Sequence, residues 1–219
     1  MSAITALTAQ NTCGVRSVLN STAEFLGEQL DVIFEDIVPD AVKIGMVSSA
    51  TLIEVIAAKL TRYGAKNVVV DPVMVATSGA RLIDEDAVQS LEEKLFPLAT
   101  IITPNVPELE VIIGEKISSP RDMELAARKI FDRYKIAVLA KGGHGQSDAN
   151  DYLFDGAGKW FHARRIDTTN THGTGCTLSS AIASNLAKGR DLKSAVERAK
   201  TYLTGALSTG LNLGVDFTD

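Results

Sequence analysis

Two hydrophobic periodicities alternate along the chain. Runs in which nearly every residue is apolar, such as NVVVD at 67–71 and IAVLA at 136–140, are typical of strands buried on both faces. Between such runs, Leu52, Ile56 and Leu60 recur every fourth residue, which predicts a helix with one apolar face. The strands predicted in this way are 2–8, 41–46, 67–71, 100–103 and 136–140, with a hairpin of 152–154 and 159–161. The predicted helices cover 20–33, 49–60, 84–95, 107–113, 119–134, 175–188 and 192–207.

This alternation decides the expected fold class. Strands as apolar as these need cover on both faces, and helices between them supply it, so a mostly parallel sheet between two helical layers follows. No internal repeat, low-complexity tract or Gly/Ser linker interrupts the pattern. We therefore expect an α/β protein, a three-layer α/β/α sandwich, with one domain over residues 1–219.

Composition narrows the functional classes. The chain is 45% hydrophobic and 22% charged, with a net charge of −5 and a pI near 5.3, whereas a nucleic-acid footprint would be basic. Cys13 and Cys176 are too few for a disulfide framework and suit a reducing compartment. Neither a run of about 18 apolar residues nor a basic leader occurs. The cytoplasm is the expected location, with a small-molecule ligand and no nucleic acid or membrane as partner.

Candidate chemistry lies where each predicted strand ends. Ligands of open α/β sheets bind beyond the carboxyl ends of the strands, so the segments that follow the strands should gather at one edge. These segments are Gln10-Asn11-Thr12, Met46, Asp71–Met74, Thr103–Glu108 and Lys141–His144.

The strongest local feature is Gly173-Thr174-Gly175-Cys176, which opens an Ala- and Ser-rich helix. The glycines let backbone N–H groups approach an anion closely, and the helix N-terminus adds unpaired donors and a favourable dipole. The pattern predicts an anion hole for phosphoryl transfer. A Gly-rich turn with Thr174 as an ordinary cap is the alternative. Neither a Walker A loop nor a complete dinucleotide-binding fingerprint is present.

Three further features each allow two interpretations. Asn105 and Glu108, three residues apart, offer hard oxygens for Mg²⁺ or form a helix-capping pair. The segment Lys141-Gly142-Gly143-His144 brings a cation and amides to phosphates or is a flexible strand exit. Cys176, at a helix start that favours the thiolate, is a nucleophile with His144 or His172 as base, a transition-state donor, or a small packing residue.

Six ordered segments resemble a known enzyme family, the hydroxymethylpyrimidine/phosphomethylpyrimidine kinases of thiamine biosynthesis, which have a ribokinase-like fold. They are ITALTAQNTCGV (4–15), KIGM (43–46), VVVDPVMVATSG (68–79), ITPNVPE (102–108), KGGH (141–144) and THGTGCTLSSAIA (171–183). The resemblance runs from about residue 2 to residue 212. It implies ATP- and Mg²⁺-dependent phosphorylation of 4-amino-5-hydroxymethyl-2-methylpyrimidine and then of its monophosphate, by a homodimer.

The same resemblance assigns roles to the substrate and metal residues. Gln10 is expected to hydrogen-bond the pyrimidine ring, and Met46 and Val73 to line its pocket. Asn105 and Glu108 are expected to organise Mg²⁺ and the phosphates.

The nucleotide residues follow from the resemblance as well. Lys141 and Thr171 are expected beside the nucleotide, and Gly173, Thr174, Gly175 and Cys176 are expected to form the anion hole. Related sugar kinases carry an Asp base where Cys176 stands, so the thiol argues against a sugar kinase. It also implies that positioning and charge stabilisation, rather than base strength, supply the rate.

The chain departs from the family pattern at both ends. The family begins with a strand, a Gly-rich segment of the kind GTDPSGGAG and a helix before the stretch at 4–15, and it ends with a Gly-His-Gly-like tail. These departures predict that this chain phosphorylates poorly or not at all. Two alternatives therefore stand beside the pyrimidine kinase: a pyridoxal or pyridoxine kinase, and a non-catalytic ligand-binding remnant of the fold.

Overall fold

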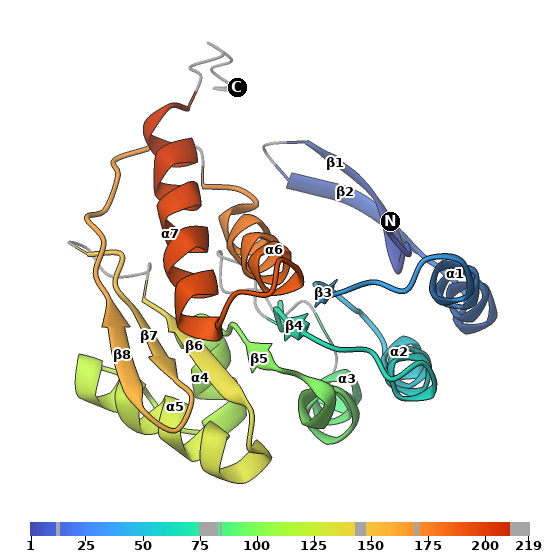
Figure 1. Ribbon diagram of the computed structural model, residues 1–219, viewed down its shortest axis with the longest axis horizontal. Helices are drawn as coiled ribbons and strands as arrows, with labels where there is room; N and C mark the ends of the chain where they lie inside the picture. Colours follow the sequence, from blue (N-terminus) through green and yellow to red (C-terminus); the bar gives the residue numbers. More distant parts are fainter. Residues whose placement is uncertain (12–13, 75–82, 84, 143–147, 169–170, 211–219) are drawn as a thin grey trace.

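In a computed structural model, residues 1–11, 14–74, 83, 85–142, 148–168 and 171–210 are described. A six-stranded sheet in the order β3-β4-β5-β6-β7-β8 forms the centre (Figure 1). Its strands are β3 (Val42–Ile44), β4 (Val68–Val70), β5 (Ile101–Ile102), β6 (Ala137–Lys141), β7 (Asp151–Phe154) and β8 (Gly158–Phe161). The pairs from β3 to β6 are parallel, and β7 and β8 add an antiparallel edge. The mostly parallel sheet predicted from the sequence is confirmed.

Helices cover both faces of this sheet (Figure 1). One layer contains α6 (Thr174–Ala187) and α7 (Leu192–Ser208). The other layer contains α1 (Ala23–Asp36), α2 (Ala50–Arg62), α3 (Glu85–Ser90), α4 (Val106–Ile113) and α5 (Pro120–Tyr134). After α3 the chain continues through a π-helical turn, Leu91–Leu95, and a 3₁₀ turn, Phe96–Leu98. The three-layer α/β/α arrangement is therefore the one that the hydrophobic pattern predicts.

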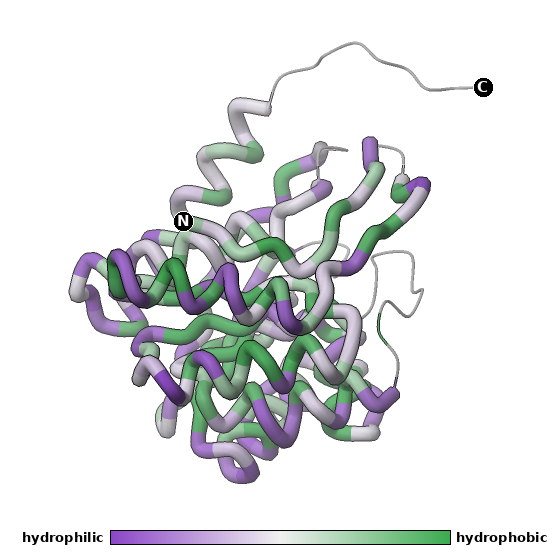
Figure 2. The backbone as a smooth tube through the Cα atoms, turned by 90° about the vertical axis from the view of Figure 1, so that its right-hand side faces the viewer, coloured by the Kyte–Doolittle hydropathy of each residue, from purple (hydrophilic) through white to green (hydrophobic). Residues whose placement is uncertain are grey.

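Strand alternation divides the apolar side chains between two cores. Val68 and Val70 of β4 pack in the larger core under α1 to α5, whereas Val69 between them packs against α6 and α7. The strands are almost fully apolar for this reason, since successive side chains point to opposite faces and both faces are buried. Figure 2 shows polar and apolar residues alternating every few positions along the helices on the side of α1 and α2.

The predicted caps explain where several helices begin. The Ser49 hydroxyl accepts a hydrogen bond from the Leu52 N–H, and the Ser119 hydroxyl accepts one from the Asp122 N–H just before Pro120. Such caps satisfy backbone donors that the first turn leaves unpaired. Gly156, with φ of 102°, lies in the predicted turn between β7 and β8.

The prediction for the N-terminus is wrong. Instead of a buried strand over 2–8, the chain forms an exposed antiparallel hairpin of β1 (Ala6–Asn11) and β2 (Gly14–Asn20). Within the described residues, this hairpin forms a separate two-stranded sheet (Figure 1). The apolar residues suggested burial, but Leu7 and Leu19 are 60% and 68% exposed. No helix of the described part of the chain is long and apolar enough to cross a membrane.

Candidate active site at the carboxyl edge of the sheet

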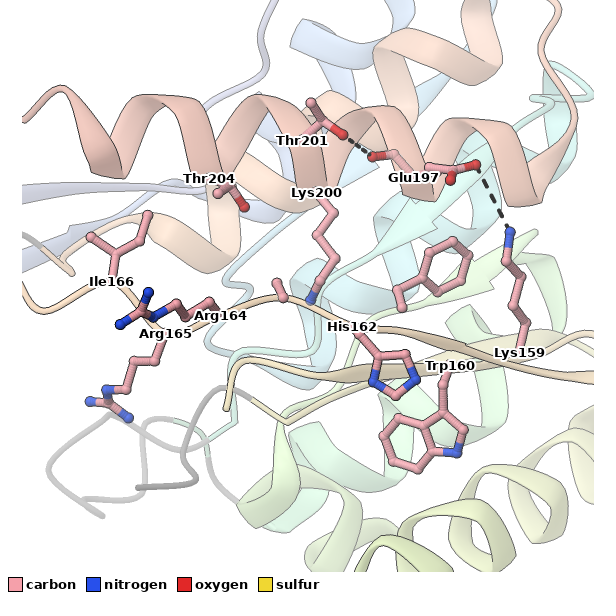
Figure 3. Close-up of a pocket in the computed structure, with 12 residues that line it drawn as sticks. Lys159, Trp160, His162, Arg164, Arg165, Ile166, Glu197, Lys200, Thr201 and Thr204 are labelled. Atoms are coloured by element: carbon pink, nitrogen blue, oxygen red, sulfur yellow. Dashed lines mark hydrogen bonds and ion pairs between the residues drawn. The ribbon is translucent and has the colours of Figure 1, made fainter. Parts of the chain in front are cut away.

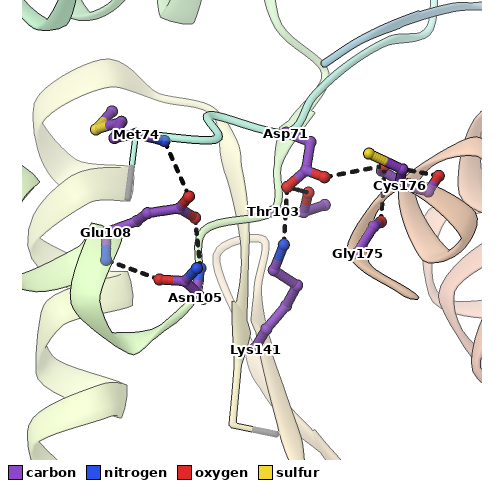
Figure 4. Close-up of polar contacts among 9 residues, drawn as sticks. Asp71, Met74, Thr103, Asn105, Glu108, Lys141, Gly175 and Cys176 are labelled. Atoms are coloured by element: carbon purple, nitrogen blue, oxygen red, sulfur yellow. Dashed lines mark hydrogen bonds and ion pairs between the residues drawn. The ribbon is translucent and has the colours of Figure 1, made fainter. Parts of the chain in front are cut away.

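The carboxyl ends of three parallel strands meet the start of α6, as the strand-end argument predicts (Figure 4). Asp71 follows β4, Thr103 follows β5, and Lys141 ends β6. The Lys141 Nζ donates to Asp71 Oδ1 at 2.7 Å, and the Thr103 hydroxyl donates to the same oxygen at 3.1 Å. A cation and a carboxylate, both largely buried, therefore lie at the sheet edge where a ligand is expected.

Backbone donors at the start of α6 complete this edge. Gly173 precedes the helix with φ of 77°, a left-handed conformation that favours glycine, and within the described part of the chain no side chain caps the helix. Thr174 turns its hydroxyl to the Thr171 carbonyl at 2.9 Å. The N–H groups of Gly175 and Cys176 donate to no acceptor among the described residues. N–H donors left unpaired at a helix N-terminus can bind an anion.

Gly175 lies next to the ion pair. A Cβ built on Gly175 would be 3.3 Å from the Lys141 Nζ and 3.6 Å from Asp71 Oδ2. The Lys141 ammonium, the Asp71 carboxylate and the first turn of α6 thus form one cluster. The Cys176 thiol is free and exposed at the same turn. Thr171, also exposed, contributes its carbonyl to this turn through the bond from Thr174.

Asn105 and Glu108 form the capping pair that was the alternative to a metal site (Figure 4). The Asn105 side chain accepts from the Glu108 N–H at 2.9 Å, and the Glu108 carboxylate accepts from the Asn105 N–H at 2.9 Å and from the Met74 N–H at 3.0 Å. Glu108 is 2% exposed. Burial raises the pKa of Glu108, and the nearby Lys141 ammonium opposes this rise. No group of three or more His, Cys, Asp or Glu suited to a metal occurs in the described residues.

The expected pyrimidine residues are spread over three elements. Gln10 of β1 reaches residues 171–173 before α6, called here the anion loop, where its Nε2 lies 2.7 Å from the His172 Nε2. Met46 follows β3 and lines an apolar groove of ≈ 470 Å³ along that strand. Val73 follows β4 with φ of 45°, a conformation that β-branched residues rarely adopt. Such strain collects at functional sites, so it is consistent with the role expected for Val73. No described contact joins Met46 or Val73 to the cluster at α6.

Two features of this edge were absent from the expected site residues. Asp71, singled out only as a strand end, is the partner of Lys141. The second residue is Lys200 of α7, whose Nζ lies 2.5 Å from Asp151 Oδ2. Asp151 connects it to the sheet edge, because Asp151 Oδ1 accepts a hydrogen bond from the Gly142 N–H at 3.0 Å. The sequence signal for Asp71 was an Asp directly after a fully buried strand, whereas Lys200 carries no local signal. Gly143, His144 and Cys13 lie outside the described residues.

Lys200 also forms the floor of a cleft of ≈ 480 Å³ between β8 and α7 (Figure 3). The cleft is rich in cationic and aromatic side chains. Its lining includes Trp160, His162, Arg164, Arg165, Lys200 and Thr204.

Comparisons with known proteins give this geometry a context. The family model for phosphomethylpyrimidine kinase matches residues 1–218. The hydroxymethylpyrimidine/phosphomethylpyrimidine kinase of Rhizobium meliloti is 49% identical over 218 residues, which are 98% of this chain and 81% of that protein. The thiamine biosynthesis bifunctional protein ThiED of Geobacter sulfurreducens is 51% identical over 217 residues. These are 97% of this chain and 44% of the Geobacter protein, so the chain spans less than half of that relative.

Solved structures agree on the fold. The phosphomethylpyrimidine kinase from Clostridium difficile 630 superposes with a TM-score of 0.85 at 44% identity, covering 94% of this chain and 86% of that one. The pyridoxal kinase from Staphylococcus aureus in complex with AMP-PCP has a TM-score of 0.88 at 30% identity, covering 98% and 79%.

The fold and the matching kinases define a phosphotransferase with the ribokinase-like α/β architecture. Within that class, the chain belongs to the phosphomethylpyrimidine kinase family. The resemblance of the six ordered segments is thereby confirmed.

Proposed function

We propose that this chain transfers the γ-phosphoryl group of ATP to the hydroxyl of 4-amino-5-hydroxymethyl-2-methylpyrimidine, and then a second phosphoryl group to the resulting monophosphate. The observation that carries the proposal is the position of the Lys141 ammonium next to Gly175, whose N–H and that of Cys176 have no acceptor among the described residues. Together they offer positive charge and oriented donors at one point, which is what a transferring phosphoryl group requires.

The substrate oxygen attacks the γ-phosphorus while the bond from phosphorus to the β,γ-bridging oxygen breaks, and ADP leaves. The amides of Gly175 and Cys176 hold the equatorial oxygens, and Thr171 and Lys141 lie beside the nucleotide. In the first transfer the hydroxyl proton is lost as the new bond forms, and the exposed Cys176 side chain is the group proposed to lie beside it. A loose transition state demands little base strength, so this position does not need a strong base.

Mg²⁺ fits this site through Asn105 and Glu108. Their oxygens are the hard ligands that Mg²⁺ prefers, and the ion keeps several waters when one or two carboxylates and substrate phosphates bind it. Since the Glu108 oxygens already accept backbone N–H groups, we propose that both side chains hold the ion through water. When bound, Mg²⁺ would neutralise charge on the phosphates.

The pyrimidine ring is proposed to lie under the β1–β2 hairpin, hydrogen-bonded by Gln10 and bordered by Met46 and Val73. The contact between Gln10 and His172 supports this placement, because it brings the hairpin to the anion loop. The proposed assembly is a homodimer. The exposed Leu7, Val18 and Leu19 of the hairpin support it, since apolar side chains of this kind are commonly covered by a partner. The cytoplasm is the proposed compartment.

The test is a turnover assay with ATP, Mg²⁺ and the hydroxymethyl pyrimidine, in which phosphorus NMR follows the monophosphate and then the diphosphate. Pyridoxal is the competing alcohol, because the Staphylococcus structure at 30% identity is a pyridoxal kinase. A larger kcat/KM for the pyrimidine supports the proposal, and a larger value for pyridoxal replaces it with the second candidate. If pyrimidine raises the melting temperature of the chain while no phosphate is transferred, the chain is a ligand-binding remnant.

A further inference from the structure

Asp71 is a deeply enclosed charged group at the candidate active site, as buried as Glu108. It is 2% exposed, and three different elements supply its neighbours. Lys141 of β6 and Thr103 after β5 donate to Oδ1, while the hydroxyl of Ser179 in α6 lies 3.3 Å from Oδ2. A carboxylate removed from water to this degree is costly unless a cation and hydrogen bonds compensate it.

The location of this carboxylate is unfavourable for a phosphate site. Oδ2 lies 3.6 Å from the position that a Cβ on Gly175 would take, beside the amides proposed to hold phosphoryl oxygens. A carboxylate at this position repels a bound anion. Lys141 is the cation placed between these charges, with its Nζ bonded to Asp71.

Asp71 also connects the cation to the helix that carries the amides. The Ser179 hydroxyl lies between Asp71 Oδ2 and the Gly175 carbonyl, at 3.3 Å and 3.0 Å. The carboxylate therefore touches both the ammonium and the first turns of α6. A displacement of Asp71 would change the distance between the two groups that receive the phosphoryl charge.

We propose that Asp71 is a positioning residue for phosphoryl transfer and that Lys141 serves first as its counter-ion. Asp71 fixes the position of the Lys141 ammonium relative to the α6 amides. Lys141 in turn cancels a carboxylate that would otherwise oppose nucleotide binding. This inference rests on the proposed function, because it assigns the α6 amides to the nucleotide phosphates.

The test is a double-mutant cycle of Asp71→Asn, Lys141→Met and both together. The primary readout is ADP affinity by calorimetry at pH 8, and the second is kcat with saturating ATP. We expect Lys141→Met to weaken ADP binding, and Asp71→Asn added to it to restore roughly tenfold, within the coupling that contacting charges show. Asp71→Asn alone should lower kcat while ADP affinity is kept or increased, a division that general structural damage does not produce.

Equal ADP affinity for Lys141→Met and the double variant would overturn the counter-ion role, since it would mean that Lys141 acts only on the phosphates. An unchanged kcat in Asp71→Asn would overturn the positioning role. The exposed pair Lys129–Glu115, changed to Met and Gln, is the matched control and should leave both readouts unchanged. If the unmodified chain binds ADP but does not turn over pyrimidine, the proposed function fails while the affinity cycle still decides on Lys141.

Discussion

The side chains of Gln10 and His172 meet at 2.7 Å although 162 residues separate them in the chain. Gln10 belongs to an exposed hairpin, and His172 belongs to the loop that opens α6. Their contact joins the element proposed to hold the substrate to the element proposed to hold phosphate. Both sides of the proposed reaction are thereby brought to one end of the molecule.

Removing the Gln10 amide should therefore act on the pyrimidine and not on the nucleotide. We expect Gln10→Ala to raise KM for the pyrimidine roughly fivefold, the equivalent of about 1 kcal/mol for one neutral hydrogen bond, with KM for ATP unchanged. Steady-state kinetics with each substrate varied in turn measures both constants. His172→Ala is the matched control, because it removes the same interloop contact. Identical effects of the two variants would mean that Gln10 only anchors the hairpin.

An acidic side chain at Gly175 should abolish nucleotide binding. Its Cβ would already be 3.3 Å from the Lys141 Nζ, and the added carboxylate would compete with phosphate for that ammonium and stand beside Asp71. We expect Gly175→Asp to weaken ADP binding by about 100-fold or more, since a buried like charge costs several kcal/mol. Gly175→Ala controls for bulk alone and should lose far less. Full ADP affinity in Gly175→Asp would remove the anion hole from the proposed site.

The fold was predictable because its determinants are local. The strand in 67–71 can be recognised from a short run of apolar residues that is buried on both faces. The helix after Ser49 can be recognised from its cap. The hairpin of β1 and β2 was not predictable by the same rule. Its apolar residues imply burial, yet Leu19 is 68% exposed. The apolar side chains of the hairpin therefore do not pack in either core of the sheet.

The candidate site was predictable only in part, for a related reason. Strand ends and the helix N-terminus pointed to Lys141, Gly175 and Cys176, because topology alone places them at one edge. The pairing of Asp71 with Lys141 depends on two side chains 70 residues apart, which no local pattern contains. For Asn105 and Glu108 the sequence could not decide between two roles, since their spacing suits both a helix cap and a metal site. The structure shows the cap and leaves the metal role a prediction.

The Cys176 thiol should contribute little as a base. It is exposed at the first turn of α6, and the proposed transition state gains more from charge stabilisation than from proton transfer. We expect Cys176→Ala to lower kcat by roughly tenfold or less, compared with the 10²- to 10⁴-fold typical of a general base. Single-turnover rates at pH 8 isolate the chemical step. A loss beyond about 100-fold would assign proton transfer to this residue.

Glu108 should make the stability of the fold fall as pH rises. Burial raises its pKa above the ordinary value of 4.5, so the folded state binds the proton more tightly than the unfolded state does. The stabilisation is complete below that ordinary value and is lost as pH rises through the raised pKa. Glu108→Gln cannot titrate, so the unfolding free energy of wild type minus that of the variant should decrease over this range. Urea unfolding in EDTA from pH 4 upward measures it, and a flat difference would contradict the shift.

The ion pair of Lys200 and Asp151 should be a major source of stability for α7. Both side chains are buried, at 11% and 9% exposed, and Asp151 also accepts the Gly142 N–H beside Lys141. Lys200→Met leaves that carboxylate without its cation, which should cost about 3–5 kcal/mol in urea unfolding, as for other broken buried pairs. Adding Asp151→Asn should restore a large part of the loss, because the stranded charge is then gone. If the double variant is no more stable than Lys200→Met, packing of the lysine stem rather than charge holds α7 to the sheet.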